Sequence, residues 1–396
     1  MASKLVDIVN LNADASCLEA CYWLKVLNGG TGSKLYRLFE AYVRYGKKVT
    51  LGIAGATAAD IAIRNPEVID LINAHSQTFE VVYRPFAHDI AQLRSLEGFN
   101  ENLRIGKETI DTIFRQVTPA YLPPEFMLTT EQLGELAGHA MECTFINSRR
   151  FNEETRSRLP DFPYRILTIF DQGFPCFPID GRLTKGYLHA LHFYDNSRWE
   201  KRIAEHPYDT VVGWRDGESP FFLPDGVGRE IAWLRGETDR IERIFLREYM
   251  AQYGLERLSV SQHPYLQHYP VHSFSAWMRE FRMLGYIERV RDFEQNLSKF
   301  SSLEKILWLQ TINSDILSAV EKRSPVIQLL SEGRVSDHTI WRTERHVEGE
   351  AFLHLRSRVA DLATFEEMTA KHWGDRFAHF TKLDIRHKFL TDRGII

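Results

Sequence analysis

The chain has 396 residues, of which 44% are hydrophobic and 26% are charged, values that exclude a disordered or collagen-like protein. A formal net charge of -4 gives no overall attraction to nucleic acid or to an anionic membrane. The 4 cysteines include no CxxC pair, which argues against a disulfide scaffold and a cysteine zinc site, and no apolar run is long enough for a membrane span or signal peptide. We therefore expect a reduced, cytoplasmic, soluble protein without nucleic-acid or membrane partners.

Short apolar runs rich in β-branched residues alternate with amphipathic helical patterns through the first two-thirds of the chain. This alternation favours a parallel barrel, with an open doubly wound sheet as the alternative. In chain order, the predicted strands are 5–11, 48–54, 78–83, 120–122, 143–146, 165–170, 210–214 and 257–261. The predicted helices between them are 33–45, 56–75 with a break at Pro66, 102–114, 130–138 and 228–253.

The strand signal stops after about residue 273, and the rest of the sequence reads as successive helices, for example 276–285 and 302–330. No Gly/Ser-rich or Pro-rich linker separates the two regions, so we expect the helices to pack on the barrel. The predicted fold is thus a distorted parallel (β/α)7-8 barrel over residues 1–272, followed by a helical C-terminal domain over residues 273–396.

Carboxylates follow two of the predicted strands, where a parallel barrel carries its functional groups. Glu125 comes after strand 120–122 and two prolines, and Asp216 and Glu218 come after strand 210–214, separated by a Gly217 that allows a sharp turn. A pair of carboxylates over one barrel mouth is what glycoside chemistry needs, one to attack or stabilise the anomeric carbon and one to protonate the leaving oxygen. Two aromatic residues that could stack on a sugar flank the second site, Trp214 and Phe221.

Several segments resemble motifs of glycoside hydrolase family 57, in the family's order, over roughly residues 83–341. Residues 121–125 (YLPPE) are similar to the motif that carries the family's catalytic glutamate, and residues 216–221 (DGESPF) to the motif of its catalytic aspartate. Residues 336–341 (SDHTIW) resemble a third motif from the helical region, and residues 83–89 (YRPFAHD) a segment with a histidine and a proline after the third strand. The resemblance implies that Glu125 is the nucleophile and Asp216 the acid/base. It also implies roles in saccharide binding for His88, Glu218, Asp337, His338 and Trp341.

The chain departs from the family pattern after its first strand. There the family has paired histidines, whereas residues 10–14 read NLNAD. Asn12 or Asp14 would take over as a sugar-binding group. This identifies the chain as a divergent member, acting on an α-glucan-like or related saccharide as a retaining α-glycosidase or a glycosyl transferase.

Histidines offer a second interpretation. His263 begins a bent loop with two further histidines after the last predicted strand, and we assign it to substrate binding rather than to a metal. Related deacetylase barrels bind a metal through an aspartate and two histidines, which His88-Asp89 and the pair His189 and His192 approach most closely. A metal-dependent sugar deacetylase is therefore the alternative enzyme, and a carbohydrate-binding relative with reduced catalysis is the non-enzymatic one. The lead hypothesis needs neither metal nor cofactor, and it leaves the oligomeric state open.

Overall fold

The computed structural model describes residues 3–12, 26–146, 164–166, 173–193, 196–206, 209–222, 225–238, 240–252, 256–258, 290–292, 294–312 and 383–396. Within these residues, no helix is both long and apolar enough to cross a membrane. The predicted barrel is confirmed: seven strands run parallel in the order β8-β1-β2-β3-β4-β5-β7 and form a nearly closed barrel. Closure is approached where the Asp180 N–H, just beyond β7, donates to the Val212 carbonyl of β8 at 2.8 Å.

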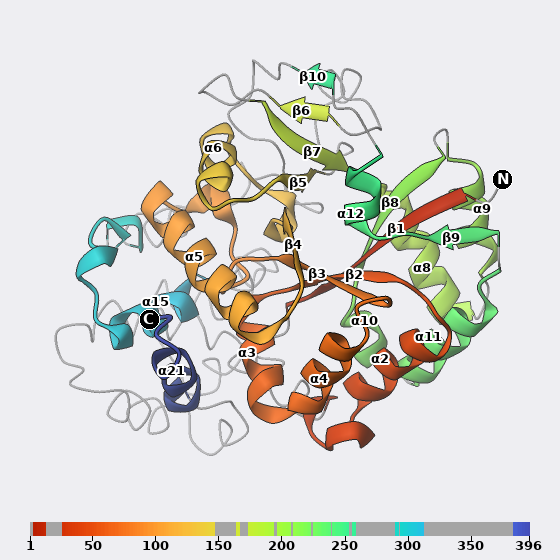
Figure 1. The fold of residues 1–396 in the computed structure, drawn as a ribbon, viewed down its shortest axis with the longest axis horizontal. Helices are drawn as coiled ribbons and strands as arrows, with labels where there is room; N and C mark the ends of the chain where they lie inside the picture. The colour runs from red at the N-terminus through yellow and green to blue at the C-terminus, as the bar shows by residue number, and fades with distance from the viewer. Residues whose placement is uncertain are drawn as a thin grey trace, which may run out of the picture.

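The strands pass through the middle of the molecule, with helices α2, α3 and α4 along one side and α5 and α6 along another (Figure 1). The strands are β1 (Ser3–Leu11), β2 (Val49–Ile53), β3 (Phe79–Tyr83), β4 (Val117–Tyr121), β5 (Cys143–Ile146), β6 (Tyr164–Ile166), β7 (Phe174–Pro178), β8 (Thr210–Asp216), β9 (Ile241–Arg243) and β10 (Glu256–Leu258). The longer helices are α2 (Lys34–Arg44), α3 (Gly55–Arg64), α4 (Pro66–Ala74), α5 (Leu96–Ile113), α6 (Thr130–Gly138), α8 (Gly181–Phe193), α9 (Ser197–Ala204), α11 (Gly226–Gly236), α15 (Ser302–Thr311) and α21 (Leu383–Thr391). The short helices are α10 (Ser219–Phe222) and α12 (Leu246–Met250), together with the 3-10 turns η1 (Gly30–Gly32), η2 (Ala91–Leu93), η3 (Pro124–Phe126) and η5 (Leu297–Lys299).

Three of the sequence-based elements are wrong in detail. The strand predicted at 165–170 becomes β6, which is antiparallel to β7, and the one at 257–261 becomes β10, which pairs with β6, so neither belongs to the parallel barrel. The barrel strand after β5 is β7, in a segment with two prolines that has no clean strand pattern. The helix predicted at 228–253 is interrupted by β9, which pairs with the first residues of β1.

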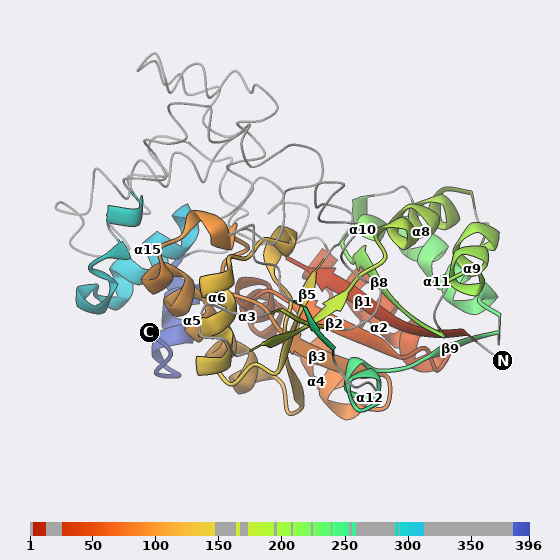
Figure 2. The ribbon, with the colours of Figure 1, turned by 90° about the horizontal axis from the view of Figure 1, so that it is seen from above.

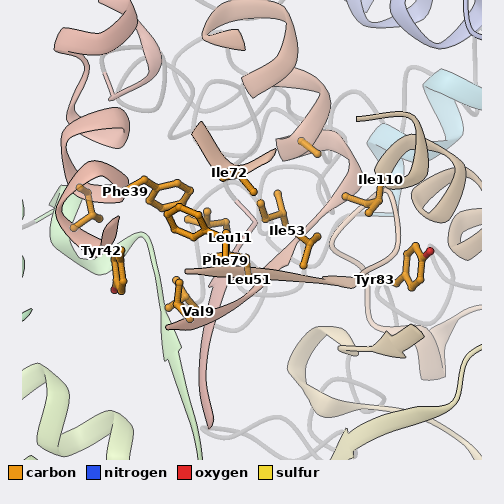
Figure 3. Packing of buried hydrophobic residues seen from close by; sticks show 14 of the residues in the cluster. Val9, Leu11, Phe39, Tyr42, Leu51, Ile53, Ile72, Phe79, Tyr83 and Ile110 are labelled. Carbon is orange, nitrogen blue, oxygen red and sulfur yellow. The ribbon is translucent and has the colours of Figure 1, made fainter. Parts of the chain in front are cut away.

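Apolar side chains of successive strands alternate between two cores, as the pleat of a strand requires. Val9 and Leu11 face outward, where they meet residues such as Phe39 and Phe79, whose rings lie 5.6 Å apart under helix α2 (Figure 3). Residues of the opposite parity fill the barrel interior, where the core consists chiefly of Val6, Ile8, Val82, Ala120, Leu122, Cys143, Phe145, Phe177, Ile179 and Val212. The parity of a strand residue therefore tells whether its side chain points into the barrel.

A buried ion network ties β1, β8, β9 and α11 together on the outer side of the barrel. Asp7 of β1, whose side chain is fully buried, contacts Arg215 of β8 at 3.0 Å and Arg243 of β9 at 2.5 Å. Arg215 also contacts Glu230 of α11 at 2.6 Å, and Arg243 contacts Glu237 at 2.8 Å. The guanidinium of Arg215 further lies over three aromatic rings, those of Tyr42, Tyr187 and Trp233.

The amino-terminal end of the barrel is closed by helix α12. Glu80 of β3 points inward and is 2% exposed. Its carboxylate accepts hydrogen bonds from the hydroxyls of Thr50 on β2 and Thr118 on β4, each at 2.7 Å, and from the N–H groups of Leu246 and Arg247 at 2.7 and 3.0 Å. One carboxylate thus joins three strands to the first turn of the helix.

The described part of the C-terminal region is helical and packs on helices α3 and α5, on the side of the molecule opposite to the N-terminus (Figure 2). Arg386 of α21 contacts Asp60 of α3 at 3.0 Å, and Glu294 accepts hydrogen bonds from Arg94 at 2.8 Å and from the Ser95 N–H at 2.9 Å. The domain boundary predicted at residue 272 lies outside the described residues and stays a prediction.

We predict that Asp7→Asn lowers the free energy of unfolding by about 3–5 kcal/mol at pH 7, because it leaves two buried guanidinium groups short of a counter-charge. Urea unfolding measures the change. The matched control is Glu40→Gln, which removes the partner of Arg44 on the solvent-exposed face of helix α2. There the side chain of Arg44 is 62% exposed and that of Glu40 is 45% exposed. That substitution should change the unfolding free energy by about 0.5 kcal/mol or less.

The pH dependence of this difference has a definite sign. Burial alone would raise the pKa of Asp7, but Arg215 and Arg243 outweigh burial and hold the pKa below its usual value. The stabilisation is therefore fully present above the unfolded-state pKa of about 3.9 and is lost as the pH falls through the lower folded-state value. Unfolding at a series of pH values should show the wild type losing its advantage only below about pH 4. An advantage that already declines between pH 7 and 5 would contradict the assignment.

Candidate functional site

Glu125 lies just beyond the carboxyl end of β4, in the turn η3 that its two preceding prolines begin. Its backbone is left-handed, with φ 52° and ψ 10°, and Phe126 follows with φ 56°. Neither residue is glycine, so each costs about 1–3 kcal/mol that the surrounding structure must offset, a feature that clusters at functional sites. The side chain of Glu125 is 22% exposed, so the strained turn presents a carboxylate that a ligand can reach.

The side chain of His88 lies beside the Glu125 carboxylate. Its Nε2 lies 3.9 Å from Glu125 Oε1, which is longer than a hydrogen bond and forms an ion pair only when the imidazole is protonated. His88 comes from the loop after β3, so the carboxyl ends of two neighbouring strands meet here. The structure thus brings His88, predicted to bind a saccharide, close to Glu125.

Asp216 ends β8, opposite Asn10 of the adjacent strand β1. Its Oδ1 accepts the N–H of Glu218 at 3.0 Å, and Glu218 Oε1 in turn accepts the N–H of Asn12 at 2.5 Å. Asn12 Oδ1 accepts from the side-chain amide of Asn10 at 2.5 Å, so the ends of β1 and β8 are held together by a chain of polar groups. Asn12, predicted to bind substrate, therefore lies directly beside the loop of Asp216 and Glu218.

Gly217 lies in a turn directly after β8, as expected, although its backbone is not left-handed. The position also has no room for a side chain, because a Cβ there would lie 2.5 Å from Val9 Cγ1 and 2.9 Å from the Asn10 carbonyl oxygen. Glycine is needed because the loop packs directly against β1, which keeps Asp216 and Glu218 close to the strand ends.

The two carboxylate segments meet across the barrel. Phe126, next to Glu125, packs edge-on against Trp214, two residues before Asp216, with ring centroids 5.5 Å apart. Trp214 is half-buried, and its parity with Val212 points it inward. A single aromatic contact therefore connects the η3 turn of β4 to the end of β8.

A buried arginine that the sequence analysis did not single out lies among these carboxylates. Arg84 follows β3, is 1% exposed, and interacts electrostatically with Glu218, Glu125 and Asp216. Burial lowers the pKa of Arg84 to about 10, although Tyr121 and the three carboxylates oppose that shift. The alternation of side chains along β3 could have revealed this arginine. Positions 80 and 82 face inward, and Arg84 is the next position on the same side.

Other predicted site residues are placed as follows. Phe221, expected to flank a sugar, is 1% exposed and packs in the main hydrophobic core, so its part in binding stays a prediction. Five predicted binding residues lie outside the described residues: Asp14, His263, Asp337, His338 and Trp341.

A metal site finds no support in the part of the chain that the structure describes. There, no three His, Cys, Asp or Glu side chains are grouped as metal ligands would be. His189 lies on helix α8 and not in a loop at the end of a barrel strand. The deacetylase alternative thus gains no observation beyond its sequence pattern.

Comparison with solved structures shows the same fold in enzymes of low sequence identity. A GH57-type branching enzyme from Pyrococcus horikoshii matches with a TM-score of 0.61 at 10% identity, over 97% of both chains. The GH57 branching enzyme TK1436 from Thermococcus kodakaraensis matches with a TM-score of 0.57 at 11% identity, over 96% of both chains. A 4-alpha-glucanotransferase from Thermococcus litoralis matches with a TM-score of 0.55 at 14% identity, over 81% of this chain but only 53% of its own.

At the level of sequence, a comparison with curated proteins found no match. The family model of glycosyl hydrolase family 57 matches residues 17–257, which include both carboxylate segments and the six barrel strands after the first. This match covers more than half of the sequence and confirms the resemblance seen in the motifs. The chain therefore belongs to glycosyl hydrolase family 57.

Proposed function

We propose that the protein is a retaining α-glycosidase or glycosyl transferase that acts on an α-glucan or a related saccharide. The observation that supports this proposal is the contact between the segments of Glu125 and Asp216, where the rings of Phe126 and Trp214 lie 5.5 Å apart, together with the buried Arg84, which interacts electrostatically with both carboxylates. The likeness in fold to branching enzymes and a 4-alpha-glucanotransferase supports an α-glucan as the substrate. A cytoplasmic location is part of the same proposal.

In the proposed reaction, Glu125 attacks the anomeric carbon and forms a bond to it while the bond to the leaving oxygen breaks. Asp216 gives its proton to that oxygen. An acceptor, either water or a sugar hydroxyl, then loses its proton to Asp216 and attacks the same carbon, which releases Glu125 as a carboxylate. A retaining mechanism of this kind calls for a carboxyl separation of about 5–5.5 Å.

The charge on Glu125 would determine when Asp216 holds its proton, as the two roles require. While Glu125 is negative, it disfavours a second negative charge on Asp216 and helps that group to keep its proton. Once Glu125 is bonded to the sugar it is neutral, so Asp216 ionises more easily and can act as a base. The same electrostatic coupling thus serves both halves of the reaction.

Replacing the proposed nucleophile tests the first role. Glu125→Gln should abolish turnover of an α-glucan while leaving sugar binding largely intact, because the amide keeps the shape of the side chain but cannot attack as an anion. Turnover assays and calorimetric binding to a maltooligosaccharide separate the two effects. Glu131→Gln, on the exposed first turn of α6, is the matched control and should keep full activity.

Replacing the proposed acid tests the second role by comparing leaving groups. Asp216→Asn should lower kcat/KM by about 10²–10⁴-fold for a natural glycosidic bond. The same substitution should lower kcat/KM much less for an activated glycosyl fluoride, because its leaving group needs little protonation. Equal losses on both substrates, or no loss on either, would remove Asp216 from this role.

The helical region is also expected to contribute to the site. Asp337 and Trp341 are four residues apart in the SDHTIW segment and would share one face of a helix. Trp341→Ala should raise KM for a saccharide several-fold with little change in the thermal unfolding temperature. An unchanged KM would exclude Trp341 from substrate binding.

A further inference from the structure

Arg84 is a buried cation in the barrel mouth to which the proposed reaction gives no role. Its position in the strand pattern points it inward, with Glu80 and Val82. The absent side chain of Gly52 on β2 makes room for it, because a Cβ at that position would lie 3.4 Å from Arg84 Cδ. The stem of Arg84 therefore crosses the inner side of β2 and carries its guanidinium toward the strand ends.

The surroundings of that guanidinium are mainly acidic. It interacts electrostatically with three carboxylates, those of Glu125, Asp216 and Glu218, and with the buried Tyr121 hydroxyl. Within the described residues, its Nε and Nη1 have no hydrogen-bond partner. These two nitrogens therefore make no fixed hydrogen bonds to the carboxylates, and the interaction that the structure supports is one of charge.

Three carboxylates in a poorly hydrated site cannot all stay ionised without a counter-charge, because like charges raise each other's pKa. His88 also lies near Glu125, but its Nε2 is 3.9 Å from Glu125 Oε1, and an imidazole carries a positive charge only when it is protonated. Arg84, whose pKa burial lowers only to about 10, still carries its charge at neutral pH. A cation is thus present where the proposed nucleophile must be an anion.

We propose that Arg84 is a positioning residue that balances the charge of Glu125, Asp216 and Glu218 and so keeps Glu125 ionised and ready to attack. The inference rests on the proposed function, since it assigns Arg84 to the same two carboxylates. It goes beyond that function by naming a group outside the carboxylate pair that fixes the pH range in which the pair works.

Carbon-13 NMR tests the inference without any need for turnover. In protein labelled at the glutamate carboxyl carbons, the Glu125 resonance is identified by its loss in Glu125→Gln. We expect Glu125 of the wild type to titrate at or below the ordinary value of about 4.3, and Arg84→Met to raise its pKa by about 1 unit or more. Arg84→Lys, which keeps the charge, should stay close to the wild type. His88→Gln, measured alongside, identifies any titration step that belongs to the imidazole.

Arg44→Met is the matched control, because it removes the same charge from the solvent-exposed face of helix α2 and should leave the Glu125 pKa unchanged. A folded Arg84→Met variant in which Glu125 titrates as in the wild type overturns the inference. If that variant does not fold, Arg84→Gln takes its place. The titration of the wild type is by itself a test of the inference, because a Glu125 pKa above about 6 would mean that no effective counter-charge acts on this carboxylate.

Activity gives a second, separable readout. Both limbs of the pH profile of kcat/KM on an α-glucan should move to higher pH in Arg84→Met, because the loss of positive charge disfavours both ionised carboxylates. A merely structural role would lower activity without moving the profile, and that result would also overturn the inference. If the wild type turns over no saccharide, the proposed function fails, and the NMR titration still decides the role of Arg84.

Discussion

A single buried carboxylate, that of Asp7, sets the register on which the candidate site depends. Its charge is stable inside the protein only while Arg215 and Arg243 face it, because an unpaired buried carboxylate would cost several kcal/mol. Arg215 is therefore held on the outer side of β8, and strand alternation then turns its neighbour Asp216 inward. A slip of one residue between β1 and β8 would expose Asp216 to the helices and bury Arg215 in the barrel. The ion network outside the barrel thus orients the chemistry within it.

Much of the fold can be predicted from the sequence because buried parallel strands and amphipathic helices have strong patterns. The helix at 56–75 and its break at Pro66 are examples, since proline starts α4 at its first position. The order and direction of strands at the edge could not be predicted in this way. The run at 165–170 is apolar enough for a strand, but nothing in its composition says that it pairs antiparallel to β7. Strand β9 was hidden in a charged helical pattern, because Arg243 is buried through its ion pairs rather than through apolarity.

The same contrast holds for the site. Glu125 and Asp216 could be found because both follow a strand and both lie in recognisable segments, whereas the strained backbone of Glu125 has no signal in its residue type. Arg84 was missed because an isolated arginine in a loop usually means a solvated surface. That Arg84 is buried becomes clear only from the barrel, because the barrel determines which side of β3 faces inward. The turn at Gly217 could be predicted, whereas the close approach of β1, which leaves no room for a side chain there, could not.

The carboxylate of Glu80 also limits how a long ligand can use this barrel. Its four hydrogen bonds hold helix α12 across the amino-terminal end, and the apolar interior above it is filled by side chains. Among the described residues, the barrel axis is therefore blocked at the end that α12 covers. A polymer that reached Glu125 would have to approach from the carboxyl ends of the strands and could not pass along the barrel axis.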